Sequence, residues 1–141
     1  MKAWLHEDLG ICATVDPIDA NAASSNSDAI DMSKFSEVMF IIALGVLNDS
    51  ATCTVTIKEA ATSGGSYTAI SGKSQAIVGT DDAKQFIISV KSEELGAGKR
   101  YVRSEMTNSA HSQLMAIVAL GRPLYRPGTD DDLSTVQTPV A

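Results

Sequence analysis

The stretch ATCTVTIKE, residues 51–59, alternates between apolar and polar side chains almost throughout. Successive side chains of a β-strand point to opposite faces, so such a run predicts a strand with one buried and one solvated face. The apolar positions are Cys53, Val55 and Ile57, and the polar positions are Thr52, Thr54, Thr56 and Lys58. This stretch therefore favours a half-exposed strand over a helix.

Further strand-like runs lie on both sides of this stretch, separated by short polar or glycine-containing segments. They cover residues 11–15, 36–46, 67–79, 84–91, 99–108 and 112–121, with two short strands expected within 67–79. We expect a loop at residues 16–28, begun by an Asp-Pro pair, and one helical turn at residues 92–95 capped by Ser92. The pattern predicts an all-β fold, an antiparallel β-sandwich that is jelly-roll-like or immunoglobulin-like.

The chain length of 141 residues suits a single domain with an extended segment at each end. We expect an N-terminal arm at residues 1–10, a β-sandwich domain at 11–121 and an extended C-terminal arm at 122–141. The last segment holds three prolines and an acidic triplet, a composition typical of an arm rather than of a strand.

Two of the expected strands are apolar on both faces. In residues 37–44, Val38, Phe40, Ile42 and Leu44 oppose Met39, Ile41 and Ala43. In residues 114–120, Leu114, Ala116, Val118 and Leu120 oppose Met115, Ile117 and Ala119. A two-layer sandwich buries one face of each sheet, so the second face needs a cover. The cover is either a loop or arm of the same chain or another subunit.

The composition argues against several classes of partner. The net charge is −6 and the isoelectric point is about 4.7, whereas binding to nucleic-acid phosphates requires clustered cations. The longest apolar run, VMFIIALGVL, is about half a membrane span. We therefore expect no nucleic acid and no membrane as partners. The N-terminus lacks the apolar region of a signal peptide, so we expect synthesis in the cytoplasm, with Cys12 and Cys53 as reduced, buried thiols.

The residues that carry most enzyme chemistry are sparse and scattered in this sequence. The two histidines, His6 and His111, lie outside any recognisable nucleophile or metal motif. The acidic run Asp130–Asp132 lacks the spacing of a calcium loop, and a solvated tail explains it. We therefore expect no enzymatic activity, no metal and no cofactor.

The segment LGAGKRYVRSEMTNS, residues 95–109, allows two interpretations. Leu95 precedes Tyr101 by six residues across a glycine-containing link, as in the tyrosine corner of immunoglobulin-like sandwiches. An inward Tyr101 would also turn Arg103 and Glu105 inward unless a bulge resets the alternation. Otherwise Tyr101 is exposed and there is no corner. On one face, Arg103 and Glu105 form either a cross-strand pair or a subunit contact.

The order of several segments resembles a family of small structural proteins of tailed bacteriophages, some of which are head decoration, or cement, proteins. The segments are DAIDMSKFSEVMFIIALGV (28–46), TCTVTIKEAATSGGSYTAISG (52–72), TDDAKQFIISVKSEELGAGKRYVRSEMT (80–107) and ALGRPLYRPGTDDDL (119–133). The resemblance spans roughly residues 28–133, and GKRYVR and DDDL are its sharpest pieces. It implies a β-sandwich or jelly roll that binds outside the coat shell, between capsomers.

On this resemblance, the expected partner is the major capsid protein, and the expected location is the outer surface of a virion assembled in the host cytoplasm. Aromatic residues and arginine dominate interface energies. We therefore expect capsid or subunit contacts at Trp4, Leu5, Arg103, Leu124, Tyr125 and Arg126. We also expect a homo-oligomer, a trimer in preference to a dimer. The alternatives are a tail, neck or baseplate protein and a carbohydrate-binding sandwich module.

Overall fold

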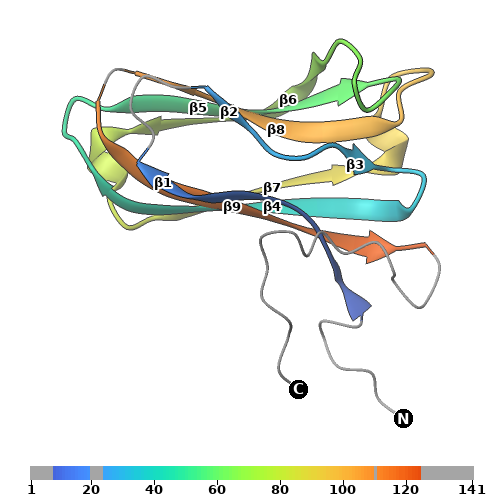
Figure 1. Cartoon of the computed structure of the whole chain (residues 1–141), viewed down its shortest axis with the longest axis horizontal. Coiled ribbons are helices and arrows are strands. Elements are labelled where there is room, and N and C mark those ends of the chain that lie inside the picture. The colour runs from blue at the N-terminus through green and yellow to red at the C-terminus, as the bar shows by residue number, and fades with distance from the viewer. Residues whose placement is uncertain (1–7, 20–23, 110, 125–141) are drawn as a thin grey trace.

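The protein is a sandwich of two antiparallel β-sheets, seen in a computed structural model that describes residues 8–19, 24–109 and 111–124 (Figure 1). Sheet A contains, in spatial order, β1 (Gly10–Asp19), β9 (Gln113–Pro123), β4 (Phe35–Leu47) and β7 (Gln85–Lys91). The β-strands of this sheet include the two longest apolar runs of the sequence. The all-β prediction is confirmed.

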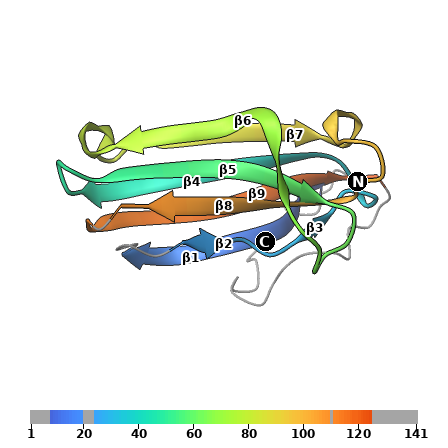
Figure 2. The same cartoon turned by 90° about the horizontal axis from the view of Figure 1, so that it is seen from above.

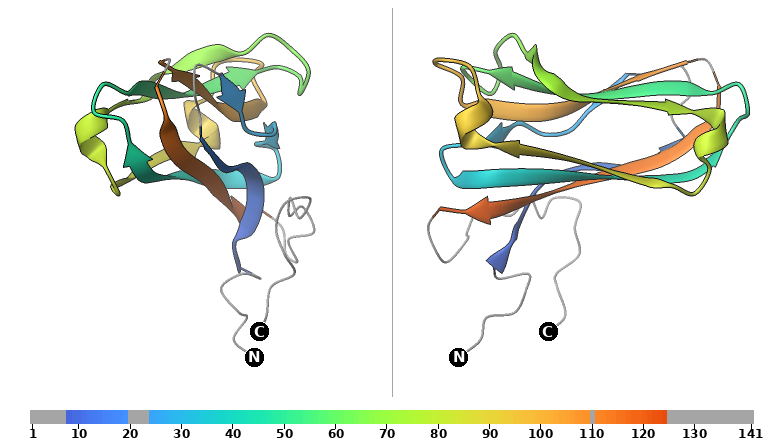
Figure 3. Two further views of the ribbon diagram at one scale, coloured as in Figure 1. Left: turned by 60° about the vertical axis from the view of Figure 1, so that its left-hand side comes forward. Right: turned by 180° about the vertical axis from the view of Figure 1, so that it is seen from behind.

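Sheet B lies over sheet A and is more polar. It contains β2 (Ser25–Asn26), β8 (Tyr101–Asn108), β5 (Thr52–Ala60) and β6 (Thr68–Val78), and the short β3 (Ile30–Asp31) also pairs with β8. Seen from above, β6 lies over β7, β5 over β4 and β8 over β9 (Figure 2). The views from the side and from behind show the same two layers (Figure 3).

The chain passes from one sheet to the other at most of its connections. The exceptions are the β5–β6 hairpin and the link from β2 to β3, whose strands lie in the same sheet. Short 3₁₀ turns make two of the crossings: η1 (Gly79–Asp81) joins β6 to β7, and η2 (Ser92–Glu94) follows β7. As a result, strands that are distant in sequence lie side by side.

The core fills the space between the two sheets. From β4 it takes Val38, Phe40 and Ile42, and from β5 it takes Val55 and Ile57, all of which are fully buried. Each buried side chain of this size contributes roughly 1.5–3 kcal/mol relative to an exposed one. The alternation predicted for residues 51–59 is confirmed, because the threonines of β5 lie on the opposite, more exposed side.

Several local expectations were wrong, each for a structural reason. The first strand does not stop at the Asp-Pro pair: β1 continues to Asp19 through Pro17, where the register with β9 shifts. Proline is tolerated there because β1 is an edge strand and the shift is a bulge. The expected 16–28 loop therefore contains the end of β1 and also β2.

Two further corrections concern β6 and the helical turn. Residues 68–78 form one strand instead of two, with Gly72 at a φ of +75° where the pairing with β5 shifts. Ser92 is the first residue of η2 and not its cap. The Glu94 carboxylate accepts a hydrogen bond from the Lys91 backbone N–H at 2.8 Å.

The expected domain boundaries fall close to the ends of sheet A. Strand β1 begins at Gly10, and β9 continues through Gly121 to Pro123. Gly10 pairs with Gly121, so the start of β1 and the end of β9 lie at the same end of the sheet. Most of both expected arms, residues 1–7 and 125–141, lies outside the described residues.

Candidate interface on the outer face of sheet A

The outer face of sheet A is apolar over its two central strands. Within β4 the core-facing residues are buried, while Met39, Ile41 and Ala43 are partly exposed on the opposite side. Within β9 the same division holds between the buried Ile117 and the exposed Val118. Both strands therefore present apolar side chains to the core and to the outer face, as predicted.

Strand register arranges the outer side chains in rows that cross the sheet. One row is Ile11, Leu120, Met39 and Ser89, and the next is Thr14, Val118, Ile41 and Ile87. A third row is Ala116, Ala43 and Gln85. Among these described residues none is charged, so the centre of the face is a neutral and largely apolar surface.

Three residues of this face are large, apolar and well exposed. The exposed fractions are 62% for Ile87, 44% for Leu114 and 38% for Val118. They come from two strands, β7 and β9, with β4 between them. Contiguous exposed apolar surface of this kind marks an interaction site more often than isolated apolar residues do.

The face has a shallow hollow at each end. One is lined by Pro17, Ile18, Asp19, Gly45 and Leu114, together with neighbouring apolar residues, so it includes one carboxylate. At this end a Cβ on Gly45 would lie 3.0 Å from the Leu114 Cβ, so the two strands come close together there. The other hollow is lined by Leu9, Glu37, Met39, Ser89, Leu120 and Arg122.

A row of charged residues borders the apolar rows beside the second hollow. Glu37 pairs in register with Arg122 of β9 on one side and with Lys91 of β7 on the other. The charges across these three strands are therefore positive, negative and positive. The face combines an apolar centre with a polar border, which is the usual anatomy of a protein interface.

The outer face of sheet B is different in character. Its β5 side chains are threonines and Lys58, and the Lys58 ammonium pairs with the Glu105 carboxylate of β8. Thr56 and Ser74 are joined by a hydrogen bond between their hydroxyl groups, at 3.0 Å. This hydrogen-bonded polar surface is suited to water, so the two outer faces of the sandwich are not equivalent.

Arg103, an expected contact residue, lies in the middle of this polar cluster. Its guanidinium is 4.0 Å from the centre of the Tyr67 ring and 3.6 Å from the Glu105 carboxylate, and its side chain is 27% exposed. Burial raises the pKa of the Tyr67 hydroxyl. Within the chain, Glu105 forms a cross-strand ion pair with Lys58, and Arg103 contacts Glu105 along the same strand. A subunit contact at Arg103 stays a prediction.

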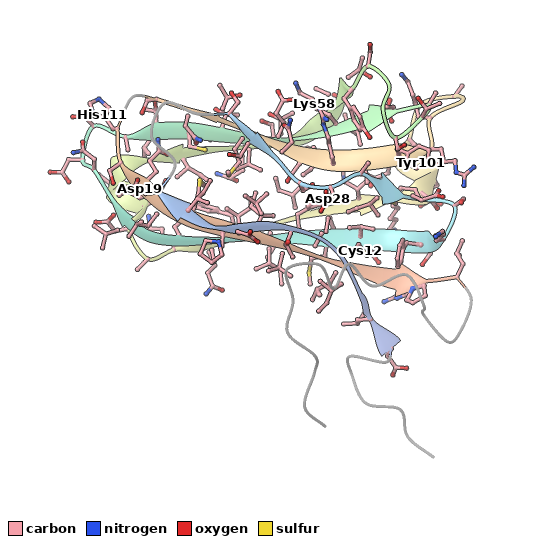
Figure 4. All side chains as sticks on the ribbon, viewed as in Figure 1. Cys12, Asp19, Asp28, Lys58, Tyr101 and His111 are labelled. Atoms are coloured by element: carbon pink, nitrogen blue, oxygen red, sulfur yellow. The ribbon has the colours of Figure 1, made fainter. Side chains whose placement is uncertain are left out.

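The tyrosine corner is not formed. Tyr101 lies on the outer side of β8 with Arg103 and Glu105, whereas Val102, Ser104 and Met106 face the core. The Arg100 guanidinium lies 5.4 Å from the centre of the Tyr101 ring. Figure 4 shows Tyr101 and Lys58 on sheet B, well away from the outer face of sheet A.

Polar contacts fix the start of β8 without a corner. The Glu59 carboxylate accepts the Gly96 N–H at 2.9 Å, and Arg100 Nε donates to Asp31 at 2.7 Å. The hydrogen bond from Arg100 holds the pKa of the Asp31 carboxyl well below its usual range. These contacts join the 95–100 segment to β5 and β3.

The edge strands of sheet A carry features that discourage strand addition. At β7, the Lys73 ammonium donates to the Ser89 carbonyl at 2.7 Å and pairs with the Glu94 carboxylate at 2.8 Å. At β1, Pro17 and the bulge beside it interrupt regular pairing. Lysine, proline and bulges are common means of protecting sheet edges. The outer face of sheet A is therefore more available to a partner than its edges are.

Among the other expected contact residues, Leu124 is the one that the structure describes. Leu124 is 49% exposed, and its N–H donates to the Lys34 carbonyl at 2.8 Å, directly after β9. Trp4, Leu5, Tyr125 and Arg126 lie outside the described residues. The structure thus places one expected arm residue, Leu124, at the end of sheet A where the charged row lies.

Cys12 on β1 and Cys53 on β5 are buried thiols on opposite sheets. Burial raises the pKa of Cys53 to about 11. Asp19 and His111 lie at the same end of the sandwich (Figure 4), where the Asp19 carboxylate accepts hydrogen bonds from Ser112 Oγ and Gln113 N.

The described residues hold neither a metal-binding cluster nor a membrane-spanning helix. Within 8–19, 24–109 and 111–124, no group of three or more His, Cys, Asp or Glu side chains is placed to hold a metal ion. The same residues form no helix that is long and apolar enough to span a membrane. Comparison with protein-family models and with curated proteins gave no match for this chain.

Proposed function

We propose that this chain is a structural protein of a tailed phage that decorates the outside of the coat shell and stabilises it. The observation that carries the proposal is the neutral, apolar outer face of sheet A, centred on Val118, Ile41 and Ile87. A sandwich does not need this face for its own core, and its exposure suits a protein that acts by association. The resemblance of residues 28–133 to phage structural proteins supports the same function.

The winding of the strands supports the jelly-roll alternative for the fold. With β2 and β3 taken as one interrupted strand, each sheet has four strands, in the orders β1-β9-β4-β7 and β2/β3-β8-β5-β6. The jelly roll is a double-sheet fold of eight strands that recurs in viral capsid and lectin domains. Fold-level analogy of this kind adds to the proposal but does not carry it.

The proposed mechanism is stabilisation by mass action. A protein that binds the assembled coat shell and not its free subunits shifts the equilibrium towards the shell. Contacts that are weak one by one gain avidity when they repeat over a symmetric surface. The segments that continue from Asp8 and Leu124 start at one end of sheet A, which suits them to reach a common partner, the major capsid protein.

A titration onto coat shells that lack the chain tests this function. We expect saturable binding at a fixed ratio to the coat protein and a rise in the temperature at which the shells dissociate. Leu124→Ser removes an exposed apolar side chain beside the terminal segment and is expected to weaken binding. The control is Val78→Ser, a similarly exposed position on sheet B. Shells that neither bind nor gain stability would overturn the proposal.

The tail, neck or baseplate alternative predicts a different stoichiometry. A decoration protein repeats with the coat protein, whereas a tail or neck component is present in a few copies per particle. The carbohydrate-binding alternative needs accessible aromatic rings. Tyr67 and Tyr101 each have an arginine guanidinium over one ring face, which leaves less of each ring for a sugar.

A further inference from the structure

The outer face of sheet A is the part of this acidic chain that a second copy can approach without repulsion. Each copy carries a net charge of −6, so random contacts between copies are unfavourable at low salt. The paired residues of the three central rows are uncharged, and the exposed Asp16 lies at the β1 margin of the third row, where the register shifts. Two such faces can be brought together without desolvating a charge in the centre.

The charged row at the end of the face is complementary to itself. In the order of the strands, Arg122 of β9 lies beside Glu37 of β4. The midline of the four-stranded sheet runs between these two strands. Consider a two-fold axis that lies in the plane of the contact and runs parallel to the strands along this midline. It sets β4 of one copy opposite β9 of the other. Glu37 of one copy then lies opposite Arg122 of the other, and symmetry forms the reverse pair.

The same axis matches the apolar rows. It sets Val118 opposite the second copy's Ile41, and Thr14 opposite its Ile87. Met39 then lies opposite Leu120, so bulky side chains meet across the centre of the contact. Face-to-face packing of sheets with strands nearly aligned is the common mode inside β-sandwiches.

The area available is close to what a specific dimer needs. Four strands span about 19 Å, and the five rows from Glu37 to Leu114, two residues apart along each strand, span about 27 Å. This gives a footprint of about 500 Å² per copy, or about 1,000 Å² in total, at the lower limit for a specific interface. An interface at this lower limit is typical of weak or transient association.

We propose that the outer face of sheet A binds the same face of a second copy of this chain, in a symmetric two-fold contact. The protected edges of β1 and β7 favour this contact over strand addition. The contact uses the same face that carries the proposed function, so in the dimer binding to the coat shell falls to the end of sheet A at Leu124. Sedimentation of the isolated protein tests the dimer and titration onto shells tests the capsid role, so either proposal can fail alone. The two-fold contact gives a dimer as the basic unit, whereas the resemblance leads us to expect a trimer.

The first test compares two lysine substitutions in the full chain by sedimentation velocity over a range of concentrations. Val118→Lys places a charge in the centre of the face, and Val78→Lys places one at a valine of similar exposure on sheet B. We expect Val118→Lys to weaken the dimer by a factor of about ten or more and Val78→Lys to leave it unchanged. Equal behaviour of both variants, or a monomer at all concentrations, overturns the proposal.

The second test mixes two charge-reversed variants and leaves the apolar centre of the face unchanged. Glu37→Arg alone sets arginine against arginine across the axis, and Arg122→Glu alone sets acid against acid, so each variant should dimerise less than the unmodified chain. The mixture should regain dimer, because both cross-copy pairs are then opposite in charge. Mixing without recovery would show that these two residues do not meet across a two-fold axis, and that another occupant, such as a terminal segment, covers the face.

Discussion

Gly121 is the glycine of sheet A at which an added methyl group should destabilise the fold most. It lies in β9, where it pairs with Gly10 of β1 and Val38 of β4. A Cβ at this position would lie 2.4 Å from the Cys12 Sγ and 2.5 Å from the Phe35 Cδ1. Ordinary contact begins at 3.4 Å, so Gly121→Ala requires both neighbours to move by about 1 Å.

The magnitude follows from two opposing effects. Overpacking a dense core costs about 1–3 kcal/mol. Replacing glycine by alanine in a strand offsets up to about 1 kcal/mol, because the unfolded chain loses conformational freedom. We expect Gly121→Ala to lower the free energy of unfolding by about 1–2 kcal/mol, which corresponds to a fall in Tm of about 3–8 °C for a chain of this size.

The assay is urea unfolding followed by far-ultraviolet circular dichroism, with Gly64→Ala as the matched control. Nothing lies within 4 Å of a Cβ built on Gly64, so this variant should be unchanged or slightly more stable. Adding Cys12→Ala to Gly121→Ala should cost less than the sum of the single changes, because the sulfur is no longer in the way. If Gly121→Ala were as stable as Gly64→Ala, the close approach of β9 to Cys12 and Phe35 would be refuted.

Three further predictions concern charge, the thiol and the core. Because Arg100 lowers the pKa of Asp31, their interaction stabilises the fold above about pH 4 and is lost as the pH falls below that value. Melting temperatures should therefore drop more between pH 4 and pH 2 in the unmodified chain than in Arg100→Gln; parallel curves would contradict this. Cys53, buried and with a pKa of about 11, should resist iodoacetamide at pH 8 until urea unfolds the chain, as mass spectrometry would show; rapid labelling of the native protein would be inconsistent with its burial. Phe40→Ala should lower the free energy of unfolding, measured in urea, by about 3–5 kcal/mol. A decrease of less than about 1 kcal/mol would contradict the packing of Phe40 in the core.

Alternation predicted the strands whose two faces differ. In β5 the pleat separates Cys53, Val55 and Ile57 from the threonines. The residue type at every second position is therefore enough to predict which face is buried. In β4 and β9 both faces are apolar, and alternation identified two candidate faces without deciding which one is buried. The structure puts Val38 in the core and Met39 outside, a choice fixed by the sheet that packs above.

The rows of the candidate interface depend on pairings between distant parts of the chain. Glu37 meets Arg122 only because β4 and β9 are neighbours in a particular register, and a single sequence carries little information on that register. Ile87 was missed for a related reason. It lies between Phe86 and Ile88, whose pattern predicts the core face, and its exposure matters only once β7 is placed beside β4.

Proline and glycine gave wrong local predictions at two positions where tertiary structure tolerates them within a strand. Pro17 lies in an edge strand at a bulge, where no ladder hydrogen bond is needed from it. Gly72 adopts a positive φ within β6, so the strand shifts register and continues instead of ending. In both places the neighbouring strand, and not the local sequence, determines the continuation.

The number of copies of this chain in purified phage particles, measured by quantitative mass spectrometry against the coat protein, tests the proposed function most directly. Decoration of the shell predicts a copy number that is comparable to that of the coat protein and stands in a fixed ratio to it. A few copies per particle would contradict decoration and favour a tail, neck or baseplate position, and absence from the particles would contradict any structural role in the virion.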